Sequence, residues 1–163
     1  MQADKRITIL GLGNVLLGDE GFGVHFVEWF RPRWRLPAKV SVLDGGVLGY
    51  RLLDTVTDCE HLIAIDVLKV ADAPGSVYRF TFAELQARLP DPTSAHEVEF
   101  PHVLMMAELM DQAPETVFLC VVPELLGEST AMQPLMATRF ALVEELLLKE
   151  LARLGVRPPR ADA

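Results

Sequence analysis

Apolar residues fall in continuous runs at several points along the chain. Residues 7–13 (ITILGLG), 61–68 (HLIAIDVL) and 116–122 (TVFLCVV) are apolar with no polar alternation, which is typical of strands that are covered on both faces of a sheet. Residues 39–46 (KVSVLDGG) predict a further strand. Residues 73–82 (APGSVYRFTF) predict a turn followed by a strand with alternating faces. About five strands are therefore expected.

Helical periodicity separates these runs. From Asp19 onward, Phe22, Phe26 and Phe30 fall on one stripe, which is the spacing of an amphipathic helix, and acidic residues suit its first turn. We expect shorter helices over 49–59, 83–89 and 101–110, and one long amphipathic helix from about 130 to 154.

This alternation predicts an α/β fold. Strands interleaved with helices favour a three-layer α/β/α sandwich around a mostly parallel sheet of about five strands. The chain has 163 residues, the length of one domain. We therefore expect a single domain over 1–163, with a core from about 5 to 154 and an unstructured tail at 155–163.

Composition narrows the function classes. Half of the residues are hydrophobic, so a well-filled core is expected, and a net charge of −8 argues against non-specific nucleic-acid binding. Cys59 and Cys120 lack C-x-x-C spacing and are predicted to be buried free thiols. The first residues do not resemble a signal peptide, and no apolar run reaches the roughly 20 residues that span a bilayer. We expect a cytoplasmic protein that does not bind membranes.

A glycine-rich segment, GLGNVLLGDEGFGV, occupies residues 11–24 directly after the first predicted strand. A dinucleotide-binding fingerprint would require glycine at position 16, where this chain has Leu16. Asp19 and Glu20 would also repel a phosphate at the helix N-terminus. The segment therefore favours cation binding or acid–base chemistry.

Acidic residues follow three of the predicted strands. Asp19 and Glu20 follow the first, Asp44 ends the second and Asp66 ends the third. Ligands collect at the carboxyl ends of parallel strands, so these acids should gather at one edge. Each acid alone could be a helix cap or a turn former. Together they would repel one another without a cation, which should raise at least one carboxyl pKa.

Histidine offers a third type of ligand. His96 lies in the polar stretch SAHEVEFPH (94–102), where Phe100 stands at the position that H-E-x-x-H would require for histidine, so a zincin site is excluded. One imidazole and two carboxylates suit a divalent ion such as nickel or zinc and leave coordination positions free. His102 has no assigned role, and His25 and His61 are expected to be structural or exposed to solvent.

The order of the motifs resembles that of the maturation endopeptidases of nickel–iron hydrogenases. The glycine-rich segment is the most specific match. The other matching segments, in the family's order, are VLDGG at 42–46, AIDVL at 64–68, APG at 73–75, SAHEVEFPHVL at 94–104 and VVPE at 121–124.

The resemblance implies an activity and a set of site residues. It implies an aspartyl-type protease that removes a C-terminal extension from a hydrogenase large-subunit precursor after nickel insertion. Carried over by motif, Glu20, Asp66 and His96 bind the metal, which the precursor presents, and no organic cofactor is implied. Asp44 is the candidate for activating water or orienting the scissile peptide, so the predicted catalytic set is Asp44, Glu20 and Asp66.

Three other functions stay open at this level. The chain could be a nickel-binding chaperone that uses the same ligands without peptidase activity, or a nucleotide-binding α/β domain. It could also be a protease that acts on another metalloprotein precursor. The expected partner is the hydrogenase large-subunit precursor, and the expected oligomeric state is a monomer.

Overall fold

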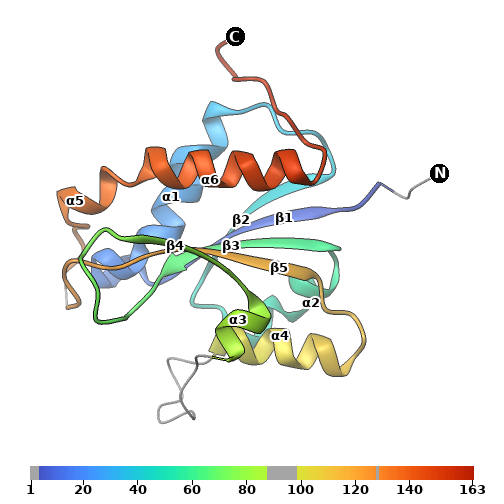
Figure 1. The fold of residues 1–163 in the computed structure, drawn as a ribbon, viewed down its shortest axis with the longest axis horizontal. Helices are drawn as coiled ribbons and strands as arrows, with labels where there is room; N and C mark the ends of the chain where they lie inside the picture. The colour runs from blue at the N-terminus through green and yellow to red at the C-terminus, as the bar shows by residue number, and fades with distance from the viewer. Residues whose placement is uncertain (1–3, 88–98, 128) are drawn as a thin grey trace.

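The computed structural model describes residues 4–87, 99–127 and 129–163. A five-stranded sheet with the order β2-β1-β3-β5-β4 lies at its centre (Figure 1). The first four strands in this order are parallel and β4 runs antiparallel to β5. The strands are β1 Ile7–Leu12, β2 Val40–Gly46, β3 His61–Val67, β4 Val77–Thr81 and β5 Glu115–Val121.

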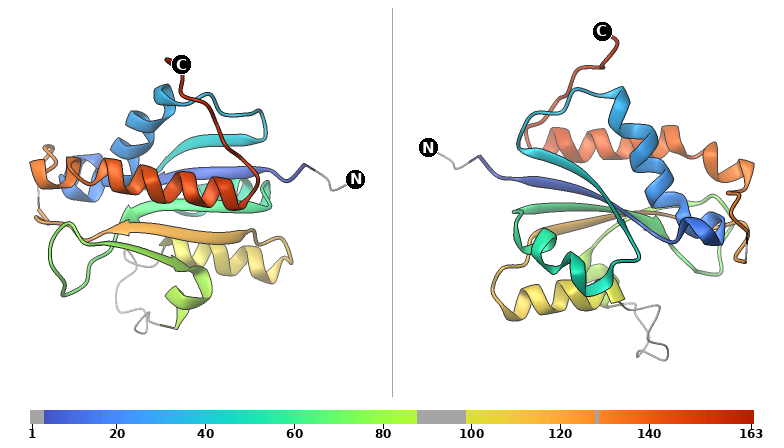
Figure 2. Two further views of the ribbon diagram at one scale, coloured as in Figure 1. Left: turned by 45° about the horizontal axis from the view of Figure 1, so that its top comes forward. Right: turned by 180° about the vertical axis from the view of Figure 1, so that it is seen from behind.

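Helices cover both faces of this sheet (Figures 1 and 2). One layer holds α1 Phe22–Phe30, α5 Pro134–Ala137 and α6 Phe140–Arg153; the other holds α2 Leu53–Thr57, α3 Phe82–Gln86 and α4 Glu99–Leu109. Short 3-10 turns are η1 Val15–Leu17, η2 Asp19–Gly21, η3 Arg31–Arg33 and η4 Gly49–Leu52. The predicted three-layer α/β/α sandwich is confirmed.

The apolar runs are buried on both faces of the sheet, as their lack of alternation predicted. In β1, Ile7 and Ile9 pack in the core shared with α1 and α6, whereas Leu10 and Leu12 pack against the α2 and α4 side. Cys59 and Cys120 are both buried free thiols, which confirms the prediction for them. Among the described residues, none of the helices combines the length and the apolar character needed to cross a membrane.

The phenylalanine stripe forms as predicted, but its helix begins later. Phe22, Phe26 and Phe30 are fully buried, with adjacent ring centroids 6.3 and 5.7 Å apart. Asp19 lies in the 3-10 turn η2 rather than in the first turn of α1, and Gly18, with φ of 58°, precedes that turn. The helix starts at Phe22 because the η2 turn directs the Asp19 carboxylate to backbone amides of the segment after β5.

The expected long C-terminal helix is divided in two. The amides of Thr138 and Arg139 bond to carbonyls three residues back, with N–O distances of 3.1 and 3.0 Å, which closes α5. The Arg139 Nε atom also donates a hydrogen bond to the Gly75 carbonyl at 2.8 Å. The prediction of one helix over 130–154 was wrong because this tertiary contact lies at the break.

Residues 155–163 are packed rather than unstructured, which corrects the expectation of a tail. Val156 is buried. The Arg35 amide donates to the Pro159 carbonyl at 3.0 Å, and the Ala161 amide donates to the Arg33 carbonyl at 2.9 Å. The basic stretch RPRWR (31–35) therefore serves to attach the end of the chain.

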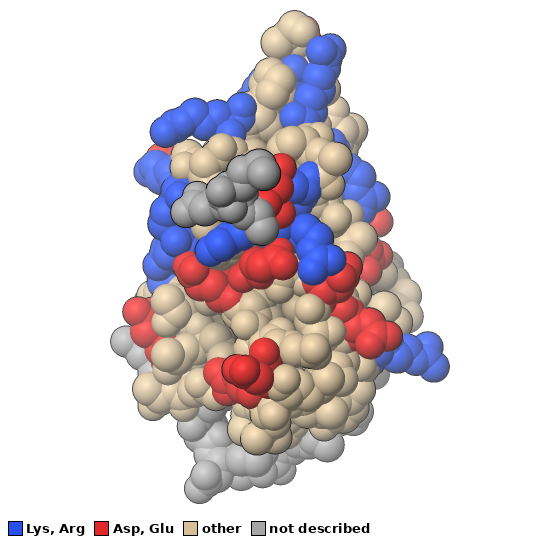
Figure 3. Space-filling view, turned by 90° about the vertical axis from the view of Figure 1, so that its right-hand side faces the viewer, with Lys and Arg blue, Asp and Glu red and all other residues tan. Residues whose placement is uncertain are grey.

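Paired charges lie at the amino-end edge of the sheet, which faces the viewer in Figure 3. Arg6 pairs with Asp58 and Glu60, and Arg153 Nη2 lies 2.8 Å from Glu115 Oε1. Acidic and basic side chains are adjacent there. The opposite, carboxyl-end edge has a different arrangement of acids.

Gly23 allows α1 to lie directly on the sheet. A Cβ atom at this position would lie 2.1 Å from the Ile65 carbonyl oxygen and 2.4 Å from that of Leu12, both of them backbone atoms. In an open helix, glycine to alanine normally stabilises by up to about 1 kcal/mol. Here the contact should reverse that sign.

We predict that Gly23→Ala lowers the free energy of unfolding by at least about 2 kcal/mol, because α1 must move away from the strands. Gly127→Ala is the matched control, since a Cβ there would meet nothing within 4 Å. Urea denaturation of both variants measures the difference. Equal stability of the two variants would contradict the proposed close packing.

Candidate functional site

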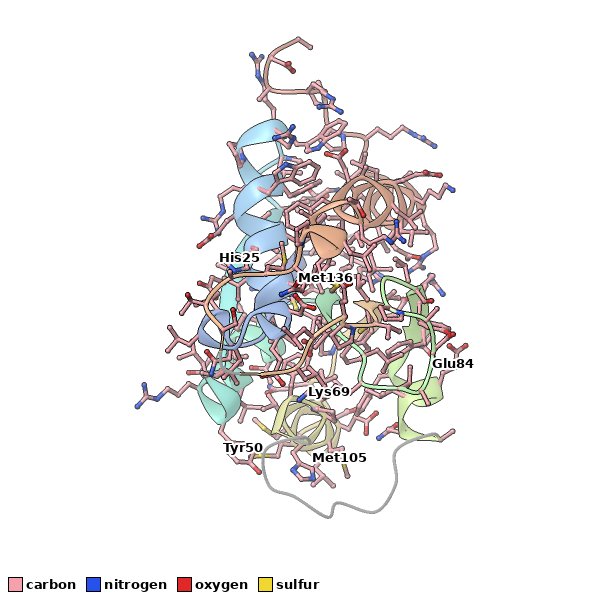
Figure 4. All side chains as sticks on the ribbon, turned by 90° about the vertical axis from the view of Figure 1, so that its left-hand side faces the viewer. His25, Tyr50, Lys69, Glu84, Met105 and Met136 are labelled. Atoms are coloured by element: carbon pink, nitrogen blue, oxygen red, sulfur yellow. The ribbon has the colours of Figure 1, made fainter. Side chains whose placement is uncertain are left out.

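The carboxyl ends of the parallel strands bring the predicted acids to one edge of the sheet. In the strand register, Gly11 of β1 pairs with Asp44 on β2 and with Ile65 on β3. Asp44 and Asp66 therefore lie on either side of the end of β1, roughly 10 Å apart across two strand spacings. Glu20 follows β1 in η2. Figure 4 looks onto this edge.

The glycine-rich segment allows its own backbone to fold tightly beside this edge. Gly13 has φ of 125°, and a Cβ atom there would lie 1.7 Å from the carbonyl oxygen of Glu20. Gly23 makes the corresponding contact with Ile65, next to Asp66. The glycines thus bring the backbones that carry Glu20 and Asp66 close together, which is the structural purpose of the segment.

Asp19 is a structural residue. Its side chain is 1% exposed. One carboxylate oxygen accepts hydrogen bonds from the amides of Glu124 and Leu125 at 2.9 and 2.8 Å, and the other accepts from the Gln133 amide at 2.8 Å. The carboxylate thereby holds the segment after β5 against η2. Sequence reasoning could not choose between Asp19 and Glu20, and these contacts assign Asp19 to the scaffold.

Glu20 lies at the carboxyl-end edge of the sheet and is paired with a basic residue. Its side chain is 18% exposed, and its Oε1 atom forms an ion pair with the ammonium of Lys69. Sequence reasoning missed Lys69. The available signal was a lysine shortly after the strand that ends in Asp66, at the edge where the predicted acids gather.

Asp66 lies at the carboxyl end of β3 and has a perturbed pKa. Its Oδ1 atom accepts a hydrogen bond from the Val67 amide at 2.8 Å. Burial raises the pKa of Asp66 to about 7; the Val67 bond and the charge of Lys69 act to lower this pKa, while the charge of Glu20 adds to the rise. A raised carboxyl pKa was expected from repulsion between the acids, but desolvation is the larger cause.

Asp44 is more accessible than the other acids. It is exposed and lies on β2, the outermost strand on its side of the sheet. A peptide could therefore approach this carboxylate without displacing the core. A carboxylate in such a position can accept a proton or a hydrogen bond from a substrate.

His96, His102 and His61 lie in three different segments of the chain. His96, the predicted third ligand, lies outside the described residues, so its role stays a prediction. His102 is partly buried on α4, and His61 is buried at the start of β3, with Nδ1 3.4 Å from Glu115 Oε2. Within the described part of the chain, no three His, Cys, Asp or Glu side chains are grouped as metal ligands would be.

The donor set still fits a divalent cation. Glu20 and Asp66 are close enough for the charge of Glu20 to raise the pKa of Asp66, and the ammonium of Lys69 already contacts Glu20. Carboxylate oxygens are ligands for divalent metals, and an imidazole added to them suits nickel or zinc. The edge can also exchange protons near neutral pH through Asp66.

We predict that Asp19→Asn lowers the free energy of unfolding by about 3 kcal/mol, because it places an amide group against backbone donors. Glu20→Gln should change this free energy by less than about 1 kcal/mol, since its ion pair is partly exposed. Chemical denaturation compares the two variants. Similar losses in both would contradict the separation of roles.

The raised pKa of Asp66 makes stability depend on pH. Between about pH 4 and 7 the unfolded chain loses this proton while the folded protein keeps it, so the free energy of unfolding falls as pH rises. Asp66→Asn removes this term. Its stability relative to the wild-type protein should rise by up to about 4 kcal/mol between pH 4 and pH 8. Denaturant titrations across this range measure the rise, and a constant difference would refute it.

Known proteins share both the sequence motifs and this fold. The family model for hydrogenase maturation proteases matches residues 24–150. The hydrogenase 2 maturation protease of Escherichia coli is 34% identical, covering 91% of this chain and 90% of the relative. The hydrogenase expression/formation protein HupD of Thiocapsa roseopersicina is 33% identical, covering 99% of this chain and 75% of the relative.

A solved structure gives the same result in three dimensions. The hydrogenase maturating endopeptidase HybD from E. coli superimposes with a TM-score of 0.90 at 31% identity, covering 96% of this chain and 98% of that one. The resemblance seen in the motifs is therefore confirmed at the level of sequence, family and fold. We conclude that the chain belongs to the hydrogenase maturation protease family and is a peptidase.

Proposed function

We propose that this peptidase removes the C-terminal extension of a nickel–iron hydrogenase large-subunit precursor after nickel has been inserted. Glu20, Asp66 and His96 bind the nickel that the precursor presents. The observation that carries the proposal is the charge-coupled pair Glu20 and Asp66, which lies at the carboxyl-end edge of the sheet with a cation against it.

Nickel acts here as part of the substrate. Coordination by the two carboxylates and the imidazole places the loaded precursor in one orientation on this edge. A precursor without nickel lacks that contact and is not held in the productive position. Much of the rate then derives from orientation, because a correctly positioned peptide no longer needs to find the catalytic group by diffusion.

Asp44 is the group that acts on the peptide. It is exposed on an edge strand, across the end of β1 from Asp66. A scissile peptide held by the nickel on one side could reach the Asp44 carboxylate on the other. There the carboxylate accepts a proton from an attacking water or a hydrogen bond from the peptide.

The test is the intact mass of a large-subunit precursor after incubation with the protein, with and without prior nickel loading. We expect loss of a C-terminal peptide from the loaded precursor alone. His96→Ala and Asp66→Asn should slow this cleavage by at least roughly 100-fold, since loss of even an outer-shell partner of a metal site costs about 10- to 100-fold. Asp44→Asn should abolish cleavage, and this variant should still form a complex with the loaded precursor.

The control is Glu145→Gln, which removes an exposed carboxylate of α6 paired with Lys149 and should cleave at the wild-type rate. If the His96→Ala variant cleaved the nickel-loaded precursor at the wild-type rate, nickel recognition by His96 would be refuted. A stable complex without loss of mass in the wild-type protein would instead support the chaperone function. Cleavage of both precursor forms at one rate would refute the nickel check.

A further inference from the structure

Lys69 already contacts Glu20, one of the carboxylates to which we assign the nickel of the precursor. We propose that Lys69 is a built-in competing cation: its ammonium pairs with Glu20, beside Asp66, until nickel docks, and it must then leave Glu20. The inference rests on the proposed function, because it concerns the same metal-recognition site. Lys69 would then set how tightly a divalent cation must bind in order to displace it from Glu20.

The ion pair gives the first argument. Lys69 Nζ contacts Oε1 of Glu20, and the charge of Lys69 also reaches Asp66. The lysine side chain is 40% exposed and that of Glu20 is 18% exposed. The ammonium thus approaches the acids from the more exposed side, and it can leave toward solvent without disturbing the core.

The backbone around Lys69 gives the second argument. The Leu68 amide donates to the Val121 carbonyl at 2.9 Å and so extends the pairing of β3 with β5. The Val70 amide donates to the Leu68 carbonyl at 3.1 Å, which forms a tight turn at Lys69. The backbone is therefore held in place, whereas the four-carbon lysine stem remains free to change rotamer. Figure 4 shows Lys69 on the carboxyl-end edge of the sheet.

Electrostatics make the two cations mutually exclusive. A metal ion bound to a carboxylate oxygen lies about 2 Å from it, so an ammonium on the same oxygen would be only a few ångströms from the metal. Two cations at that distance repel strongly. Nickel binding to Oε1 of Glu20 therefore requires Lys69 to move.

The strength of the lysine contact suits such an exchange. A partly exposed ion pair contributes little to stability, so a divalent ion with several ligands can displace it. The ammonium still offsets the repulsion between Glu20 and Asp66 while no metal is present. A metal ion that binds only weakly cannot displace the ammonium of Lys69, which is tethered to the site. Lys69 therefore favours a metal that arrives firmly bound in the precursor.

The experiment measures Ni²⁺ affinity of the free protein by isothermal titration calorimetry. Lys69→Met should bind Ni²⁺ about three- to tenfold more tightly than the wild-type protein, because the competing charge is gone. Lys69→Arg keeps the cation and should stay within about twofold of wild type. The gap between Lys69→Met and wild type should narrow at high salt, where screening weakens the competition.

Lys149→Met is the matched control, since it removes a lysine of α6 that pairs with Glu145 at 2.8 Å; its Ni²⁺ affinity should not change. Equal or weaker binding by Lys69→Met, while Glu20→Gln abolishes binding, would overturn the role of Lys69 and leave the metal site standing. Binding that is unaffected by Glu20→Gln would overturn the metal site itself, and the role of Lys69 with it.

Discussion

The close packing of the glycine-rich segment against the sheet is the constraint on which the site depends. Gly23 lies against the Ile65 carbonyl, and Gly13 lies under the Glu20 carbonyl, at distances that no side chain would allow. Because a Cβ at either position would separate these backbones, the glycines determine how near Glu20 comes to Asp66. A segment that resembles a phosphate-binding loop in composition is therefore used for backbone contact between a helix and two strands.

Two adjacent acids in this segment have opposite roles because their surroundings differ. Asp19 is buried and accepts hydrogen bonds from three backbone amides of the chain beyond β5. Glu20 faces the edge of the sheet and meets Lys69. The buried carboxylate fixes the position of η2, and the position of η2 in turn fixes the direction of Glu20. The scaffold role of Asp19 is thus a condition for the metal-binding role that we propose for Glu20.

The electrostatics of the edge combine burial with charge. Burial makes ionisation of Asp66 costly, the neighbouring Glu20 adds to that cost and Lys69 reduces it. A divalent cation would therefore stabilise the two ionised acids more than Lys69 does, because it carries two positive charges in place of one. The opposite end of the sheet has acidic and basic side chains as well, but there Asp58, Glu60 and Glu115 are matched by arginines in exposed pairs.

The sequence by itself determined the layers, the approximate strands and the edge at which the acids gather. Continuous apolar runs can be buried only in a covered sheet, and parallel strands bring their carboxyl ends together. Only the tertiary structure decided the break before α6, the packing of residues 155–163, the separation of Asp19 from Glu20 and the contact of Lys69. Each of these depends on an atom from a distant part of the chain, such as the Gly75 carbonyl or the Glu124 amide, and local periodicity contains no information about such partners.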